Sequence, residues 1–529
     1  MMKRNSKFSL LTSSALISFG VATCLAAPAG PGSPTVAPKS LPRIGTIDER
    51  FQSYNIEMVE VTGGRFWKPY ASQAEAAQGT ENQPAGMSAS LYEYRKPINL
   101  YTPRLRKLAA ALGPAYVRVS GTWANFTFFQ NSDAPAPATP PEGFRGILTR
   151  EQWKGVVDFS NATNAKIVTS FAISPGARGA NGVWTPELAQ QLLSYTKSVG
   201  GSIAAAEFMN EPTMPEMGGS PKGYDAAAFG RDIKVFLAFA KQAAPGMVVL
   251  GPGGVGEGGH LVIPGSRIIK TEDILAVTGP VFDGFSYHTY AAVSSRCSSM
   301  GKDATTTSDA ALSEDWLSRG DQIEQYYAAL RDRYEPGKPL WITETAQAAC
   351  GGDRWASTFL DSFRYLNQLG DSARRGVQVH MHNTLAASDY GLLDEKTYEP
   401  RPNYWAALLW RKLMGTTVLD PGPSPAPSLH VYAQCLRSHP GGVSLLVINA
   451  DDKNAQTLKV STASERYTLT AQSLTDKQVQ LNGADLKLGA DDALPALKGT
   501  VTKPGEITFA PASITFLALP KAHNASCQQ

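Results

Sequence analysis

The sequence has little net charge and, after its N-terminus, no long hydrophobic run. Among 529 residues, 49 lysines and arginines nearly balance 46 acidic residues, for a formal net charge of +3. Such a balance does not require a nucleic acid or an anionic membrane as partner. No later stretch is apolar enough to span a bilayer. We therefore expect no nucleic-acid partner, no membrane span and a monomer. The chain is long enough for one large domain and one smaller domain.

Cysteine is also scarce, with five in the whole chain and no Cys-x-x-Cys spacing. That spacing is the usual mark of a zinc or redox site, so we expect neither a metal nor a redox centre built from cysteines. Without Cys24, four cysteines remain, and they allow three connectivities. Their positions favour Cys297 with Cys350 and Cys435 with Cys527, which keeps each bridge within one expected domain.

The N-terminus has the pattern of a secretory signal peptide. Basic residues precede an apolar run that ends in small residues, so we expect a signal peptide at 1–29. The predicted location is secreted or periplasmic, an oxidising environment that favours disulfides. The stretch "VATC" resembles a bacterial lipidation motif, but Thr23 stands where Gly or Ala is usual, so we do not expect lipidation at Cys24.

There is no internal repeat of sequence, but from Tyr54 onward apolar runs alternate with helical patterns, eight of each. Parallel strands that are buried on both faces read as continuous apolar runs. Eight uninterrupted units favour a closed (β/α)8 TIM barrel, at 54–415, over an open doubly wound sheet. The expected strands are "YNIEMVEV", "AYVRVSG", "AKIVTSFAIS", "SIAAAEFMNEP", "GMVVLGPGG", "DGFSYHTY", "PLWITETA" and "GVQVHMHNT".

After Met414 the pattern changes to short alternating segments separated by Gly, Pro, Asn and Asp. These segments predict antiparallel strands of a C-terminal β-sandwich domain at 416–529. A Pro-rich loop at 420–428 lies near the boundary. A strand from 40–53 is expected to complete the sandwich.

Two acidic residues stand where expected barrel strands end. Glu211 follows the fourth strand in "FMNEP", and Glu344 ends the seventh in "PLWITETA". The carboxyl ends of barrel strands meet at one face, so the two carboxylates are expected to lie across the barrel mouth from each other. Facing carboxylates are what glycosidic bond cleavage needs. Asn210 could hydrogen-bond a sugar hydroxyl there, whereas Glu207 and Glu216 are weaker candidates.

The sixth and eighth strands end in further polar residues. His288 and Tyr290 lie two apart in "GFSYHTY" and so share a face of the strand. The phenol could orient Glu344 by hydrogen bonding, although packing of an aromatic ring under a loop is the alternative. His380 and His382 also share a face, but no third ligand is evident, so we expect no metal site there.

A glycine motif in "VVLGPGGVGEGG" imitates a dinucleotide fingerprint. Gly251, Gly253 and Gly256 satisfy G-x-G-x-x-G directly after a strand. The fingerprint also needs a helix that opens at these glycines, and the further glycines and Pro264 that follow prevent one. We therefore expect a loop that lines the substrate site, and no cofactor.

With these residues placed, the chain resembles glycoside hydrolase family 79, the heparanase and β-glucuronidase family. The resemblance covers nearly the whole mature chain. It depends on "FQSYNIE", "LGPAYVRVSGTWANFTFF", "FMNEP", "GFSYHTY", "TETAQAACGG" and "YGLLDEKTYEPRPNYWAALLWRKLMG", in the family's order. It implies a barrel with the acid/base on strand four and the nucleophile on strand seven.

Residue by residue, the resemblance implies Glu211 as general acid/base and Glu344 as nucleophile. Asn210 would contact the 2-hydroxyl, and Glu57 and Thr122 would line the sugar site. The substrate-binding residues that the resemblance implies for a uronate carboxylate are Gly351, Gly352 and Tyr390. Cys350 stands where the animal enzymes have Gly, so the register of this loop is open by one residue.

These expectations together predict a retaining glycoside hydrolase of β-glucuronides, acting as an endo-β-glucuronidase on heparan sulfate or glucuronide oligosaccharides. The two carboxyl groups should lie about 5 to 5.5 Å apart, the retaining separation. Alternatives are exo cleavage, another specificity such as an arabinofuranosidase or xylosidase, and a non-catalytic carbohydrate-binding protein. Arg178 and Arg296 could bind sulfate groups, but we expect both to be solvated arginines on the surface.

Overall fold

A computed structural model describes residues 34–72, 87–261, 268–300 and 302–528 of the chain. The signal peptide expected at 1–29, together with Cys24, lies outside the described residues. Within the described ranges, no helix is both long and apolar enough to cross a membrane.

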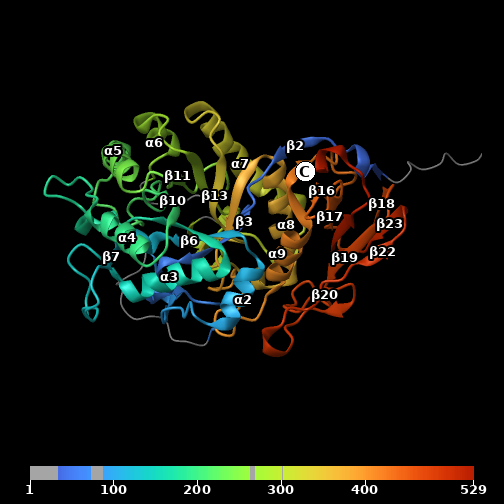
Figure 1. Ribbon diagram of the computed structural model, residues 1–529, viewed down its shortest axis with the longest axis horizontal. Coiled ribbons are helices and arrows are strands. Elements are labelled where there is room, and N and C mark those ends of the chain that lie inside the picture. Colours follow the sequence, from blue (N-terminus) through green and yellow to red (C-terminus); the bar gives the residue numbers. More distant parts are fainter. Residues whose placement is uncertain (1–33, 73–86, 262–267, 301, 529) are drawn as a thin grey trace, which may run out of the picture.

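Eight parallel strands close into a barrel in the order of the sequence (Figure 1). They are β3 (Gln52–Glu57), β6 (Ala115–Ser120), β9 (Ala165–Ser170), β10 (Ile203–Glu207), β11 (Val248–Gly254), β12 (Gly284–Thr289), β13 (Leu340–Thr345) and β14 (Val377–His382). Each strand overlaps one of the eight apolar segments identified in the sequence. Most of their residues are buried, because side chains fill the inside and helices cover the outside. The (β/α)8 TIM barrel is confirmed.

The outer layer of the barrel consists of helices that follow the strands. They are α2 (Pro103–Ala111), α3 (Arg150–Thr163), α4 (Glu187–Ser198), α5 (Ala226–Ala243), α6 (Thr271–Thr278), α7 (Glu314–Tyr334), α8 (Phe359–Arg374) and α9 (Pro402–Leu413). Capping residues in the sequence determine where several of these helices begin. Thr149 and Gln152 form a capping box at α3, and Asp225 caps α5. The sequence analysis missed α1 (Met58–Thr62), because five residues are too few to show a helical period.

Short sheets follow two of the barrel strands, on the side where those strands end. One pairs β4 (Gly64–Trp67) with β5 (Tyr92–Arg95), and the other pairs β7 (Thr127–Gln130) with β8 (Gly146–Thr149). The first of these sheets brings Trp67 to the wall of the site described below.

The C-terminal part of the chain, together with two strands from its N-terminal part, forms two further sheets. The larger contains β2 (Arg43–Thr46), β15 (Met414–Leu419), β16 (Leu429–Leu436), β17 (Val443–Asn449), β19 (Ser464–Thr470), β20 (Gln480–Leu481), β21 (Ala484–Asp485), β22 (Thr500–Thr502) and β24 (Ser513–Leu519). The smaller contains β1 (Thr35–Val36), β18 (Gln456–Val460) and β23 (Gly505–Phe509). Apolar residues of both sheets share one core, so they pack as the expected β-sandwich.

Helices α8 and α9 lie between the barrel and the sandwich (Figure 1). Tyr432 on β16 donates a hydrogen bond to Asn367 on α8, with 2.7 Å between the oxygens. Both expected disulfides are confirmed, Cys297–Cys350 among the barrel loops and Cys435–Cys527 in the sandwich.

Candidate active site

Glu211 and Glu344 face each other across one cleft at the barrel mouth. A carboxylate oxygen of each and a ring nitrogen of His288 all lie within 4.8 Å of one another. The side chains are 14% and 9% exposed, so a ligand can reach both. Both line the same cleft. Glu211 has a φ of +48°, a left-handed conformation that costs a non-glycine residue about 1 to 2 kcal/mol.

Two donors bond the carboxyl group of Glu344. Arg118 Nη1 donates to one oxygen at 2.8 Å, and the hydroxyl of Tyr290 donates to the other at 2.7 Å. Burial, and next the charge of Glu344, raise the pKa of Tyr290 well above its usual range. The phenol therefore keeps its proton and remains a donor.

Glu211 has a different neighbour, His288, whose Nδ1 lies 3.0 Å from a Glu211 oxygen. Burial opposes the charged form of His288, but the nearby carboxylates of Glu344, Glu207 and Glu211 outweigh it. The pKa of His288 is thereby raised to about 9. At neutral pH the ring is a donor toward Glu211.

Arg118, which the sequence analysis did not single out, is the centre of the site's polar network. It lies on β6, is 1% exposed, and contacts Glu207, Glu344 and Asn210. Glu207 is fully buried at the end of β10, where Ser286 and Thr343 also donate to it. Burial disfavours the Glu207 carboxylate, but Arg118, and next His288 and Thr343, hold its pKa well below the usual range.

Asn210 is positioned through both its backbone and its side chain. Its backbone N–H and C=O bond the side chain of Asn125 at 2.9 Å each. Its Oδ1 accepts from Arg118 at 2.7 Å. Asn210 is buried and is not among the residues that line the cleft, so its contact with a sugar hydroxyl stays a prediction.

Glu57 lines the cleft at the end of the first barrel strand, and Thr122 lines it from the short 3-10 helix that follows the second. Burial, and next the charge of Glu344, raise the pKa of Glu57 well above its usual range. Its Oε2 is buried without a hydrogen bond. Gly121 leaves room for this carboxyl, since a Cβ there would lie 1.5 Å from Glu57 Oε2.

Tyr390 and Asn383 also line the cleft. Asn383, not singled out from the sequence, donates to the hydroxyls of Tyr290 and Tyr390 at 3.2 and 3.3 Å. Its Oδ1 is buried without a partner. Burial lowers the pKa of His382 to about 3, so the neutral ring holds Tyr390 through an Nε2–H bond of 2.8 Å to its carbonyl.

The turn after Glu344 brings Cys350 to the cleft. Cys350 and Ala349 are among the lining residues, whereas Gly351 and Gly352 are buried directly behind them. The turn therefore lies at the cleft. The uronate-binding role of Gly351 and Gly352 stays a prediction.

Apolar side chains make up the rest of the cleft wall. They are Trp67, Met87, Trp123, Met214, Met217, Val255 and Leu261. Among the described residues that line the cleft there is no lysine or arginine.

The expectation of solvated arginines at 178 and 296 is wrong. Arg178 is nearly buried and bonds Asp232 at 2.8 Å, and Arg296 bonds Asp389 at 2.9 Å. Their charges are neutralised inside the protein because buried cations need a partner. Neither is a ready sulfate ligand.

Two cofactor possibilities can be judged from the same geometry. The spacing of Glu211, His288 and Glu344 would suit a metal ion, but the guanidinium of Arg118 lies 2.8 Å from Glu344 and would repel it.

In the glycine motif, β11 runs through Gly251 and Gly253, and the next helix in the described part of the chain, α6, begins only at Thr271. The helix that a dinucleotide fingerprint needs does not open at these glycines.

Comparisons with known proteins agree with this geometry. Residues 96–370, just over half of the chain, match the profile described as "Glycosyl hydrolase family 79, N-terminal domain". Heparanase-like protein 1 of Arabidopsis thaliana is 27% identical over 486 residues, which cover 81% of this chain and 86% of that protein. The heparanase of Mus musculus is 29% identical over 499 residues, with coverage of 81% and 88%.

Solved structures with the same fold also exist. A 4-O-α-L-rhamnosyl-β-D-glucuronidase from Fusarium oxysporum 12S, solved with Rha-GlcA, superposes with a TM-score of 0.60 at 15% identity. The superposition covers 92% of this chain and 99% of that one. At this identity the likeness shows the fold alone.

Proposed function

The chain belongs to glycosyl hydrolase family 79 and is a glycosidase, and from that premise we propose that it is a retaining β-glucuronidase. The observation that carries the proposal is the approach of Glu211 and Glu344 to within 4.8 Å, with different partners for each. Retaining enzymes place their carboxyls about 5 to 5.5 Å apart, and inverting enzymes about 6.5 to 9.5 Å. The separation here supports the retaining mechanism.

In the proposed first step, Glu344 attacks the anomeric carbon while Glu211 protonates the leaving oxygen. Arg118 and Tyr290 support the nucleophilic role of Glu344, because both stabilise its carboxylate. A glucuronyl-enzyme ester forms and the aglycone leaves with the proton. Glu211 then takes a proton from water, which attacks the ester and frees both glucuronate and Glu344.

The sugar that occupies the cleft would meet polar groups that lack partners in the protein. Glu57 Oε2 and Asn383 Oδ1 are buried without hydrogen bonds, and a sugar hydroxyl can donate to each. Asn210 would donate its amide to the 2-hydroxyl, where hydrogen bonds strengthen as the oxocarbenium-like transition state forms.

For the uronate carboxylate we propose a neutral grip by Tyr390 and the backbone N–H groups of Gly351 and Gly352. The lining of the cleft supports this assignment, since Tyr390 and Cys350 are both part of it. Backbone amides bind an anion without bringing a second cation close to Glu211. A cation there, added to His288, would oppose the general-acid role of Glu211.

The part of the cleft that would hold the leaving group determines whether the substrate is a polymer or a small glucuronide. Internal cleavage of heparan sulfate stays a prediction, supported by the names of the relatives. A sulfated chain is normally bound by arginine and lysine, and the described lining is apolar instead. This wall favours an aryl or weakly charged leaving group, so exo cleavage of such glucuronides is the alternative that the cleft supports.

Hydrolysis of an aryl β-glucuronide by the wild type and by Glu344→Gln tests the proposal. We expect turnover by the wild type and a loss of about 10³-fold or more in the variant. Equal rates would overturn the mechanism, and a wild type active only on an aryl arabinofuranoside or xyloside would overturn the specificity. Size analysis of heparan sulfate digests separates internal fragments, which mean endo cleavage, from released monosaccharide, which means exo cleavage.

We also propose that the enzyme acts outside the cytoplasm, in a secreted or periplasmic location. The two disulfides support this, because disulfides persist in oxidising compartments.

A further inference from the structure

The loop after the nucleophile strand is joined covalently to the loop after β12. The Cys297–Cys350 disulfide links them, and both cysteines are buried. Backbone hydrogen bonds run beside it, from Ala349 N to Ala292 O at 2.9 Å and from Ser294 N to Ala349 O at 3.0 Å. The disulfide packs in one apolar cluster with Tyr290 and Tyr390. It is therefore part of the wall of the active site.

The turn that begins at Cys350 has an uncommon backbone. Cys350, Gly351 and Gly352 have φ values of +63°, +82° and +80°, three left-handed residues in succession. Glycine adopts this conformation freely, whereas a residue with a Cβ is disfavoured in it. Something must hold Cys350 in place, and its side chain is fixed by the disulfide.

The carbonyl groups of the turn are bonded to the protein. Gly351 O accepts from Ser388 Oγ at 3.0 Å, and Gly352 O accepts from Ser294 Oγ at 2.8 Å. Among the described residues, no acceptor is bonded to the N–H of Gly351 or of Gly352. Successive N–H groups in a turn of this kind form a concavity that binds anions.

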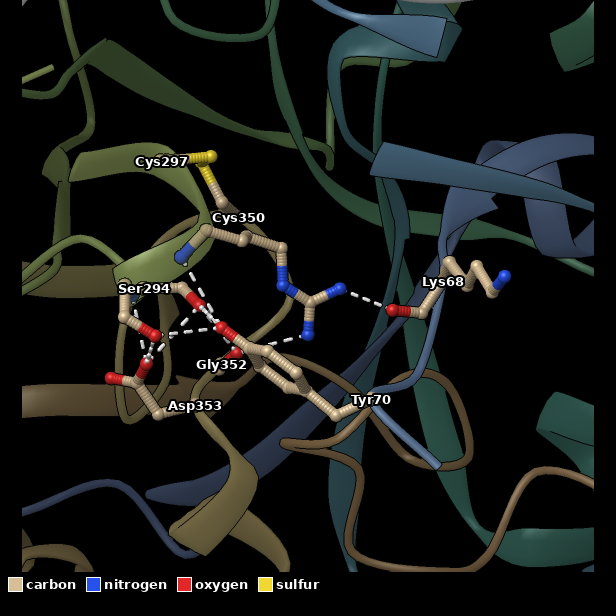
Figure 2. Close-up of a disulfide and its surroundings, with 9 residues drawn as sticks. Lys68, Tyr70, Ser294, Cys297, Cys350, Gly352 and Asp353 are labelled. Carbon is tan, nitrogen blue, oxygen red and sulfur yellow. Dashed lines mark hydrogen bonds between the residues drawn. A yellow bond between two sulfur atoms is a disulfide. The ribbon is translucent and has the colours of Figure 1, made fainter. Parts of the chain in front are cut away.

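A polar network supports the outer side of the same turn (Figure 2). Tyr70, Ser294 and Asp353 surround Gly352, and the hydroxyl of Tyr70 lies 2.9 Å from Ser294 Oγ. Asp353 accepts from the backbone N–H of Ser295 at 2.8 Å. Arg296 stacks on Tyr70 and donates to Gly352 O at 3.3 Å. These contacts hold the carbonyl side, and the disulfide holds the side that faces the cleft.

We propose that the Cys297–Cys350 disulfide is a positioning element of the carboxylate subsite, which holds Cys350 left-handed so that the turn presents its N–H groups to a uronate. This inference rests on the proposed function. It predicts that opening the bridge weakens recognition of the carboxylate more than it slows the chemical step, since Glu211 and Glu344 are held by other residues.

The experiment compares Cys297→Ala/Cys350→Ala with Cys435→Ala/Cys527→Ala, which opens the sandwich disulfide and serves as the control. Each protein is assayed on an aryl β-glucuronide and on the aryl β-glucoside, which lacks the carboxylate, and its thermal stability is recorded. We expect both variants to melt lower. Only Cys297→Ala/Cys350→Ala should have a KM for the glucuronide that is raised about tenfold, while its kcat changes less. Its preference for the glucuronide over the glucoside should be reduced.

A third variant separates positioning from general stabilisation. Cys297→Ala/Cys350→Gly also lacks the bridge, but glycine adopts the left-handed conformation unaided. We expect its KM to return toward the wild-type value while its melting temperature stays low. If all variants keep the wild-type KM, the inference is wrong and the proposed function stands. If the wild type does not cleave the glucuronide at all, the proposed function fails, and this inference fails with it.

Discussion

Arg118 donates a hydrogen bond of 2.8 Å to Glu344 from a strand three positions away around the closed barrel. The same guanidinium bonds Glu207 at 2.9 Å, so one buried cation serves a structural carboxylate and the proposed nucleophile together. The fully buried Glu207 fixes the position of Arg118, which in turn orients Glu344. The orientation of Glu344 therefore depends on residues below the cleft, in the barrel interior.

Replacing Arg118 by lysine should reduce catalysis strongly. A lysine is a point donor that cannot bond both Glu207 and Glu344, and breaking a buried ion pair costs about 3 to 5 kcal/mol. We expect kcat to fall at least about 100-fold, measured on an aryl β-glucuronide. Arg364→Lys is the matched control, because Arg364 is equally buried and paired with Asp361 on α8. A control that loses as much kcat as Arg118→Lys would contradict this role.

Gly121→Ala should disturb the sugar site through Glu57. The new Cβ would lie 1.5 Å from Glu57 Oε2, at a φ of +86°. Gly376→Ala is the control, since Gly376 has a φ of +87° but nothing within 4 Å of its Cβ position. Both variants should lose about 1 to 2 kcal/mol of stability from backbone strain. Only Gly121→Ala should raise KM, and equal KM values in the two variants would show that Glu57 does not contact the substrate.

Tyr290→Phe should lower kcat by about 10- to 100-fold while the protein stays folded. The change removes the 2.7 Å hydrogen bond to Glu344 but keeps the ring and its packing. Tyr327→Phe removes the hydroxyl of a buried tyrosine outside the cleft and should leave kcat unchanged. Steady-state kinetics of both variants provide the test, and a Tyr290→Phe enzyme with wild-type kcat would refute the assigned role.

Stability should fall as pH rises from about 5 to 8. Burial raises the pKa of Glu324 on α7 to about 8, so between its unfolded value and pH 8 the folded state binds the proton that the unfolded state has lost. The stabilisation is complete below the unfolded pKa and is lost as pH rises through the folded one. One such group gives a slope of about 1.4 kcal/mol per pH unit.

Urea unfolding at pH 5.5, 6.5 and 7.5 measures this slope. Glu324→Gln, which mimics the protonated acid, should flatten it, whereas the exposed Glu187→Gln should not. An unchanged slope in Glu324→Gln would mean that this carboxyl does not titrate as described.

The fold and the paired glutamates could be predicted from the sequence because they leave local signals. Eight apolar runs separated by helical periods determine a barrel, and a charged residue directly after a buried strand is expensive unless it is used. Counting the expected strands places Glu211 after the fourth strand and Glu344 on the seventh. The disulfide pairing followed from placing each cysteine in its part of the fold.

Arg118, Asn383 and Trp67 could not be assigned in the same way. The signal for Arg118 was present, since one arginine interrupts the apolar strand "AYVRVS", but its partners lie 89 and 226 residues further along the chain. Arg178 and Arg296 were placed at the surface for the same reason, because nothing near them in sequence indicates Asp232 or Asp389. Long-range ion pairs leave no local periodicity to read.

The most direct test of the central claim is to trap the glycosyl-enzyme. The protein is incubated with an activated 2-deoxy-2-fluoro-β-glucuronide, digested, and its peptides are mapped by mass spectrometry. Our account predicts inactivation with one glucuronyl adduct on Glu344, formed through its ester. An enzyme that hydrolyses β-glucuronides but carries no adduct, or carries it on another carboxylate, would contradict the assignment.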